Sequence, residues 1–340
     1  MNPTESKPRI DWVDYAKGIC IILVVFMHAN GGVEKLVGTQ TLFNGFIAWA
    51  KPFRMPDFFL ISGLFLASRI DQPWHRYFDA KVLHFAYFYF LWMAIQHIFK
   101  DVARGETDMS GLSHYASGLI QPFDTLWFIY LLAVFFVVVK LTRGISPVAM
   151  FAFGAWLEML PIETGSILID EFSARFVYFY VGYWMAHQVF LYADRIRGFD
   201  PAIVLLGLAL WAVFEAVIVS SGIAPMPIVS LLLGLSGTAA LIATSVLIAK
   251  TGKFSLLKYC GANSIVIYLA FSLFMGTTRI LLVKFLPGME PSLISLLSTT
   301  AGVFGPLVSH ALSRRTQLDF LFHRPQWARI GSPVRSEVVQ

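Results

Sequence analysis

The stretch YAKGICIILVVFMHAN, residues 15–30, is a long apolar segment with a lysine near one end and a histidine near the other. Lys17 and His28 are eleven positions apart, which on an α-helix is about 20° more than three full turns and about 16 Å along the axis. Both side chains are therefore expected on one helix face. Ionisable groups inside a membrane usually face a bundle interior or a water-filled cavity. The pattern favours a helix that lines a site within a membrane over a simple anchor.

The rest of the chain has the composition of an integral membrane protein. Its 340 residues are 57% hydrophobic and 14% charged, with a mean hydropathy of +0.67. A soluble protein of this length has too small an interior to bury so much apolar surface. Apolar stretches near the ~20 residues that cross a bilayer recur throughout. We predict an all-α, polytopic transmembrane helical bundle of about ten spans: 13–30, 46–69, 80–99, 124–141, 146–161, 172–193, 201–220, 227–249, 260–285 and 291–312.

The basic residues sort to one side of these spans. Eighteen of the 26 Lys and Arg residues fall at the N-terminus, in alternate loops and in the tail, whereas the opposite loops carry acids such as Glu158, Glu163 and Asp170. Cytoplasmic loops of membrane proteins are enriched in Lys and Arg. Both termini are therefore predicted to be cytoplasmic, which agrees with an even number of spans. The same bias explains the pI near 9.1 without a nucleic-acid partner.

Three shorter segments complete the organisation. Leu112–Gln121 is too short to span and is expected to be a surface or re-entrant helix. Residues 313–340 form a basic cytoplasmic tail whose end we expect to be disordered. Residues 1–30 lack the small-residue cleavage site of a signal peptide. Neither a disulfide framework nor a cysteine-based metal site is expected from Cys20 and Cys260.

Two constellations have the residue types of a reactive site. Asp14 lies about 40° from His28 around the first helix, and its alternative role is an interfacial pair with Lys17 while His28 ends the helix near water. Span 2 opens with the run FRMPDFFLISG, residues 53–63. Pro52 and Pro56 make its entry irregular, and Arg54 and Asp57 have the spacing of an i,i+3 ion pair. The alternative is a kinked packing helix.

A basic cluster follows at the inner end of span 2. Arg69 and Arg76, with His75 and Lys81, suit the binding of phosphate groups, although the charge bias of cytoplasmic loops explains each residue equally well. Arg69 follows Ser62 by seven residues, which places them about 20° apart around a helix.

Several of these segments resemble the membrane-bound acyltransferase 3 family, whose members modify bacterial surface and secreted glycans. The resemblance runs from residue 9 to about 271 and is carried by Lys17-x10-His28, by residues 53–63, by Leu126-Trp127-Phe128, by Phe179–Tyr183 and by Gly261–Leu269. It implies an integral-membrane acyltransferase domain over residues 1–312. Two positions depart from the family pattern, since Arg54 and Phe271 stand where members often have histidine. With phenylalanine at position 271, a second histidine is not available to the mechanism.

The resemblance and the residue patterns together give a set of candidate site residues. Candidate catalytic residues are His28, Lys17, Asp14, Arg54 and Asp57; candidate acyl-CoA-binding residues are Arg69, Arg76 and Ser62; candidate pocket-lining residues are Trp127, Glu215, Arg279 and Tyr268. Glu215 and Arg279 interrupt spans 7 and 9, and pairing is the simplest account of two such charges. No metal-ligand spacing is present.

These candidates predict acyl transfer from cytoplasmic acyl-CoA, most simply acetyl-CoA, to a glycan or lipid-linked glycan hydroxyl at a bacterial inner membrane. No permanently bound cofactor is expected. His28 acts either as general base or as an acylated nucleophile, and Arg54 is the candidate oxyanion donor. Two other functions compete: a glycan or lipid transporter, and a non-catalytic subunit of a polysaccharide assembly system. Acyl-CoA turnover separates the enzyme from both.

Overall fold

The computed structural model describes residues 10–104, 118 and 120–330, and these residues form helices and turns without any β-strand. The predicted all-α class is therefore confirmed for the described chain. Most of the surface or re-entrant helix predicted at 112–121 lies outside the described residues, as do residues 331–340, where disorder is expected.

Seven helices in the described part of the chain are long and apolar enough to cross a membrane. They coincide with seven of the ten predicted spans. The seven are α1 (Asp11–Val37), a continuous helix over Trp74–Asp101, Asp124–Leu141, α11 (Pro201–Ser220), α12 (Val229–Thr251), α14 (Ser264–Phe285) and α15 (Pro291–Ser313). The second comprises α4 (Trp74–Phe78), the π-helical turn η1 (Asp79–Leu83) and most of α5 (His84–Arg104); the third comprises η2 (Asp124–Leu126) and α7 (Trp127–Leu141).

The other three predicted spans are shorter or broken. The second forms α2 (Asn44–Ala50) and α3 (Arg54–Gly63), separated by a turn that contains Pro52. Because proline lacks a backbone N–H and clashes with the preceding turn, it prevents one straight helix here. The fifth is α8 (Pro147–Met159), and the sixth divides into α9 (Ile167–Trp184) and α10 (Ala186–Gly198). The total of ten spans and the side of each terminus stay predictions.

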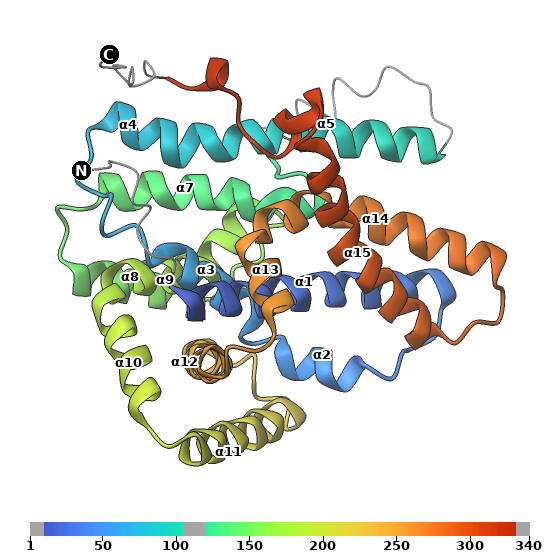
Figure 1. The fold of residues 1–340 in the computed structure, drawn as a ribbon. Helices are drawn as coiled ribbons and strands as arrows, with labels where there is room; N and C mark the ends of the chain where they lie inside the picture. Colours follow the sequence, from blue (N-terminus) through green and yellow to red (C-terminus); the bar gives the residue numbers. More distant parts are fainter. Residues whose placement is uncertain (1–9, 105–117, 119, 331–340) are drawn as a thin grey trace.

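Helix α1 lies at the centre of the bundle. It packs against α3, α12, α14, α15 and the short helix α13 (Ser255–Ala262). In Figure 1, α5 and α7 run side by side above α1, while α12 is seen nearly end-on below it. The helix that carries Lys17 and His28 is therefore surrounded by protein along much of its length.

Glycines allow two of these helix pairs to touch backbone to backbone. A Cβ at Gly261 of α13 would lie 1.6 Å from the Asp14 carbonyl oxygen of α1. A Cβ at Gly182 of α9 would lie 2.0 Å from the Leu60 carbonyl oxygen of α3. Small residues at such crossings are typical of helices that pack within membranes. They bring α13 and α9 against the two segments that carry most candidate residues.

The chain continues beyond α15 as an irregular segment with two 3-10 turns, η3 (Gln317–Leu321) and η4 (Gln326–Ala328). This part of the predicted tail packs back onto the bundle, with η3 against α15 and α5.

Candidate active site

His28 lies in the middle of α1, which continues nine residues beyond it to Val37. The alternative in which His28 ends the first helix is therefore wrong. Its imidazole faces a cavity of about 680 Å³, the His28 cavity, between α1, α5, η2 and α14. The Phe271 ring of α14 packs beside the imidazole, with 5.5 Å between the ring centroids. The polar side chains that line the His28 cavity are Lys35, Gln96, Lys100, Asp124, Thr125, Ser272 and Arg279.

Positive charge dominates the His28 cavity. Lys100 forms an ion pair with Asp124, and Lys35 and Arg279 add two further cations. The Arg279 guanidinium lies against α1, where a Cβ at Gly32 would be 1.4 Å from its Nη1 atom. Any side chain at position 32 would force the end of Arg279 to move. The buried Nε atom of Arg279 has no hydrogen-bond partner within the described residues.

Lys17 lines two further cavities, and His28 lines neither of them. One, the Lys17 cavity, has a volume of about 220 Å³ and is mostly apolar and rich in aromatic rings, with Lys17, Ser62, Lys81 and Tyr268 among its polar side chains. The other, the Asp14 cavity, has a volume of about 870 Å³ and is lined by Asp14, Lys17 and Arg69. Lys17 borders both, so the two cavities are adjacent.

An aromatic wall separates the Lys17 cavity from the His28 cavity. The Tyr268 hydroxyl donates a hydrogen bond to the Thr125 carbonyl oxygen and accepts one from the Phe128 backbone N–H at 3.2 Å. The Tyr268 ring packs on Phe128 and Phe271, with centroid distances of 5.4 and 6.3 Å. Tyr268 lines the Lys17 cavity, whereas Thr125 lines the His28 cavity. Lys17 and His28 thus lie on opposite sides of this wall.

Arg54 and Asp57 occupy the first turn of α3 but do not pair with each other. Asp57 is fully buried, and its carboxylate interacts with the Thr238 side chain of α12 and not with Arg54. Arg54 instead interacts electrostatically with Glu171 and Arg175 of α9, and it also acts on His28. The predicted i,i+3 ion pair is therefore wrong, because α9 supplies the charged neighbours of Arg54.

The predicted pairing of Glu215 with Arg279 is also wrong. Glu215 is fully buried on α11, and its carboxylate oxygens have no partner among the described residues. Helix α11 packs mainly against α12 and α2, whereas Arg279 faces α1 and the His28 cavity. Glu215 acts electrostatically on Asp57. Helices α11 and α14 therefore hold Glu215 and Arg279 apart.

Comparison with known proteins now assigns the family. A family model described as an acyltransferase domain matches residues 10–310. The chain belongs to the acyltransferase 3 family. The inner membrane protein YcfT of Escherichia coli strain K12 is 30% identical to it over 156 residues, which cover 38% of this chain and 43% of that protein. No solved structure matches the chain. The family resemblance of the sequence motifs is thereby confirmed, and the chain is a multi-pass membrane protein.

Of the remaining candidates, Ser62 and Arg69 line these cavities, whereas Arg76 and Trp127 are not among the lining residues. Ser62 lines the Lys17 cavity and donates a 2.7 Å hydrogen bond to the Phe58 carbonyl oxygen. Arg69 is exposed at the Asp14 cavity. Arg76 is exposed on α4. Trp127 opens α7 and packs on Phe59, with 6.0 Å between ring centroids.

Three charged residues of the chain were missing from the site predicted from the sequence. They are Lys35, Lys100 and Asp124, which all line the His28 cavity. The sequence does contain a signal at Asp124, because an acidic residue just before an apolar segment marks the start of a helix. Lys81, a member of the basic cluster predicted from the sequence, lines the Lys17 cavity. Within the described residues no three His, Cys, Asp or Glu side chains are grouped to hold a metal ion.

Proposed function

We propose that this acyltransferase moves an acyl group, most simply acetyl, from cytoplasmic acyl-CoA to a hydroxyl of a cell-surface or secreted glycan. One observation carries the proposal. The imidazole of His28 faces a polar cavity on one side of the Tyr268 wall, and an aromatic cavity with lysines lies on the other side. A donor and an acceptor can therefore approach the same wall from opposite sides.

The donor side suits a long thioester with a phosphate-bearing end. Lys17 and Lys81 border the Lys17 cavity, and Arg69 borders the adjacent Asp14 cavity. Cations of this kind bind phosphate groups. The narrow aromatic interior between Phe58, Phe128 and Phe136 suits an uncharged, flexible arm. We infer that the arm carries the thioester to Tyr268, that this ring moves aside to admit the thioester to His28, and that the acceptor occupies the larger His28 cavity.

His28 has the chemistry that the transfer requires. Imidazole exchanges a proton close to neutral pH, which makes histidine the commonest general base. In the proposed step, His28 takes the proton of the acceptor hydroxyl, and the oxygen attacks the thioester carbonyl carbon. The carbon–sulfur bond then breaks, and the proton passes from the imidazolium to the leaving thiolate. Arg54, which acts electrostatically on His28, is placed in this proposal beside the developing oxyanion.

Transfer of label from acetyl-CoA tests the proposal. Membranes that contain the wild type, His28→Ala or His187→Ala receive acetyl-CoA labelled in the acetyl group, at matched amounts of folded protein. His187 is an exposed histidine on α10 and serves as the control. We expect equal labelling of the glycan fraction by the wild type and His187→Ala, and a loss of at least ~100-fold for His28→Ala.

Two outcomes contradict the proposal in different ways. Full transfer by His28→Ala removes His28 from the chemistry. No transfer by the wild type, with an acceptor shown to be present, removes acetyl-CoA as the donor; it favours a different acyl donor first, and then the transporter or the non-catalytic subunit.

A further inference from the structure

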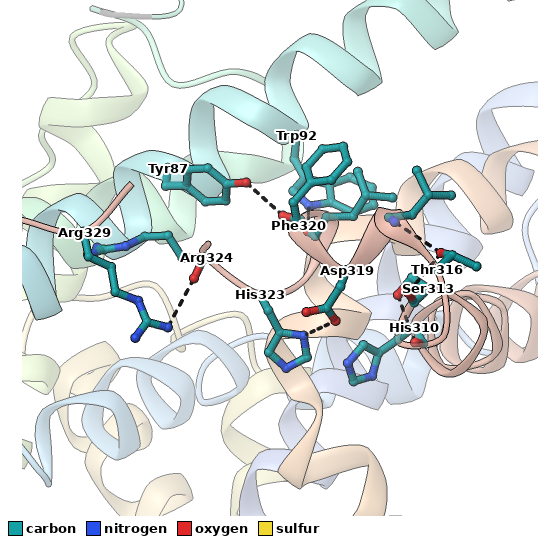
Figure 2. A network of polar contacts seen from close by, with 12 residues as sticks. Tyr87, Trp92, His310, Ser313, Thr316, Asp319, Phe320, His323, Arg324 and Arg329 are labelled. Carbon is teal, nitrogen blue, oxygen red and sulfur yellow. Dashed lines mark hydrogen bonds and ion pairs between the residues drawn. The ribbon is translucent and has the colours of Figure 1, made fainter. Parts of the chain in front are cut away.

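The segment after α15 returns across the bundle and docks on α5. We call residues 317–330 the strap. The Tyr87 hydroxyl donates a hydrogen bond to the Phe320 carbonyl oxygen at 2.9 Å, and the Trp92 indole N–H donates one to the Leu321 carbonyl oxygen at 2.9 Å. Figure 2 shows both aromatic side chains of α5 directed at the strap. Phe322 is buried and packs on the Trp92 ring.

Arg324 anchors the second half of the strap. Its side chain is only 4% exposed and forms an ion pair with Asp79. Its guanidinium also donates to the Asp79 backbone carbonyl oxygen at 2.6 Å, and the Ile330 backbone N–H donates to the Asp79 carboxylate at 2.8 Å. Arg329 in turn donates to the Arg324 carbonyl oxygen. One carboxylate of the bundle therefore holds the strap at two points.

The docked strap forms one wall of a strongly basic cavity. This Arg324 cavity has a volume of about 490 Å³, and the charged residues that line it are Arg69, Asp79, Lys81, Arg324 and Arg329. Four cations thus face one carboxylate, which is already bonded to Arg324 and Ile330. Such an excess of arginine and lysine in a concave site attracts phosphate groups, which accept paired hydrogen bonds from guanidinium.

The Arg324 cavity adjoins the proposed donor path. Lys81 lines both this cavity and the Lys17 cavity, and Arg69 lines both this cavity and the Asp14 cavity. Asp79 and Lys81 belong to the same π-helical turn, η1. Single π-helical turns inside α-helices are frequent at functional sites. This turn directs Asp79 to the strap and Lys81 to the junction of the cavities.

We propose that the strap completes a binding site for the phosphate groups of a nucleotide-bearing acyl donor, held in the Arg324 cavity while the acyl arm enters the Lys17 cavity. The inference rests on the proposed function for the identity of the donor. It goes beyond the family domain, because the family match ends at residue 310 and the strap begins after it. Lipid phosphate is the other source of the same ligand chemistry.

Nucleotide binding by the full chain in an uncharged detergent tests the site without any acyl transfer. The probe is adenosine 3′,5′-bisphosphate, which carries phosphates of CoA but no acyl arm. Arg329→Gln removes one exposed cation from the cavity and leaves the Arg324 anchor in place. Arg315→Gln is the control, since Arg315 is exposed in the same tail before the strap. We expect Arg329→Gln to weaken binding about tenfold, the value of one charge-assisted hydrogen bond, and Arg315→Gln to leave binding unchanged.

The outcomes separate this inference from the proposed function and from lipid binding. Equal affinity in the wild type and Arg329→Gln, or equal weakening by Arg315→Gln, overturns the inference. If the wild type binds the nucleotide through Arg329 but transfers no acetyl group, the proposed function fails and the site stands. A second arm of the experiment measures how much phosphatidylglycerol the wild type and Arg329→Gln each retain from mixed vesicles. Retention that depends on Arg329, with nucleotide binding that does not, overturns the inference in favour of a lipid.

Discussion

Replacing Gly261 by alanine tests whether the contact between α1 and α13 supports the donor cavities. A Cβ at this position would lie 1.6 Å from the Asp14 carbonyl oxygen and 2.7 Å from the Gly18 backbone nitrogen. To reach the 3.4 Å of an ordinary contact with that oxygen, α13 must move away from α1 by about 1.8 Å. Backbone atoms in two helices cannot rotate aside as the end of a side chain can.

The expected cost follows from this displacement. Overpacking usually destabilises a protein by 1–3 kcal/mol, and a clash between two backbones belongs at the upper end, about 3 kcal/mol. The shift also widens the Asp14 cavity, which Gly261 and Lys17 both line. We therefore expect a lower melting midpoint, by several degrees, together with reduced acetyl transfer.

The measurement is the thermal unfolding midpoint of purified protein in detergent, followed by tryptophan fluorescence. Gly207→Ala is the matched control, because a Cβ at Gly207 on α11 meets nothing within 4 Å. Alanine in a helix interior is about 0.5–1 kcal/mol more favourable than glycine, so this variant should melt no earlier than the wild type. Identical midpoints for Gly261→Ala and Gly207→Ala would refute the backbone-contact argument.

Two further predictions concern the aromatic wall. Tyr268→Phe removes the hydroxyl that bonds Thr125 and Phe128, so we expect a loss of about 1–3 kcal/mol in the same melting assay; an unchanged midpoint would show that these bonds add no stability. Phe271→Ala removes the ring beside His28 and opens the wall to water. We expect faster release of free CoA thiol in the absence of an acceptor, and a rate equal to that of the wild type would count against the wall as a barrier.

The fold was predictable wherever one local pattern decided it. Apolar length alone located seven helices that the structure contains. The apolar pattern predicts that the first helix ends at residue 30, but α1 continues to Val37 through Gly31 and Gly32. Two consecutive glycines favour a helix end in an isolated segment. Packing decides otherwise here, since Gly32 makes room for the Arg279 guanidinium from α14.

The site was predictable along α1 and much less so between helices. The 3.6-residue period suffices to put Lys17 and His28 on one face, and both side chains line cavities. The partners across those cavities come from distant segments, as in the bond from Tyr268 to Thr125. Helix crossing angles decide such contacts, and no local pattern contains them. A lone buried charge is costly, so the sequence predicts that Glu215 needs a compensating polar neighbour. It does not predict which helix provides that neighbour.

The tail shows where reasoning from charge bias stops. The bias towards Lys and Arg on one side of a membrane sorts residues by side and says nothing about individual partners. Arg324 counts in that bias, yet its side chain is buried against Asp79, 245 residues away along the chain. Arg69 and Arg329 count in it equally, and they line the same cavity. Insertion into the membrane favours Lys and Arg on the cytoplasmic side, and a phosphate-bearing donor would arrive from that same side. The charge bias and phosphate binding are therefore compatible explanations of these residues.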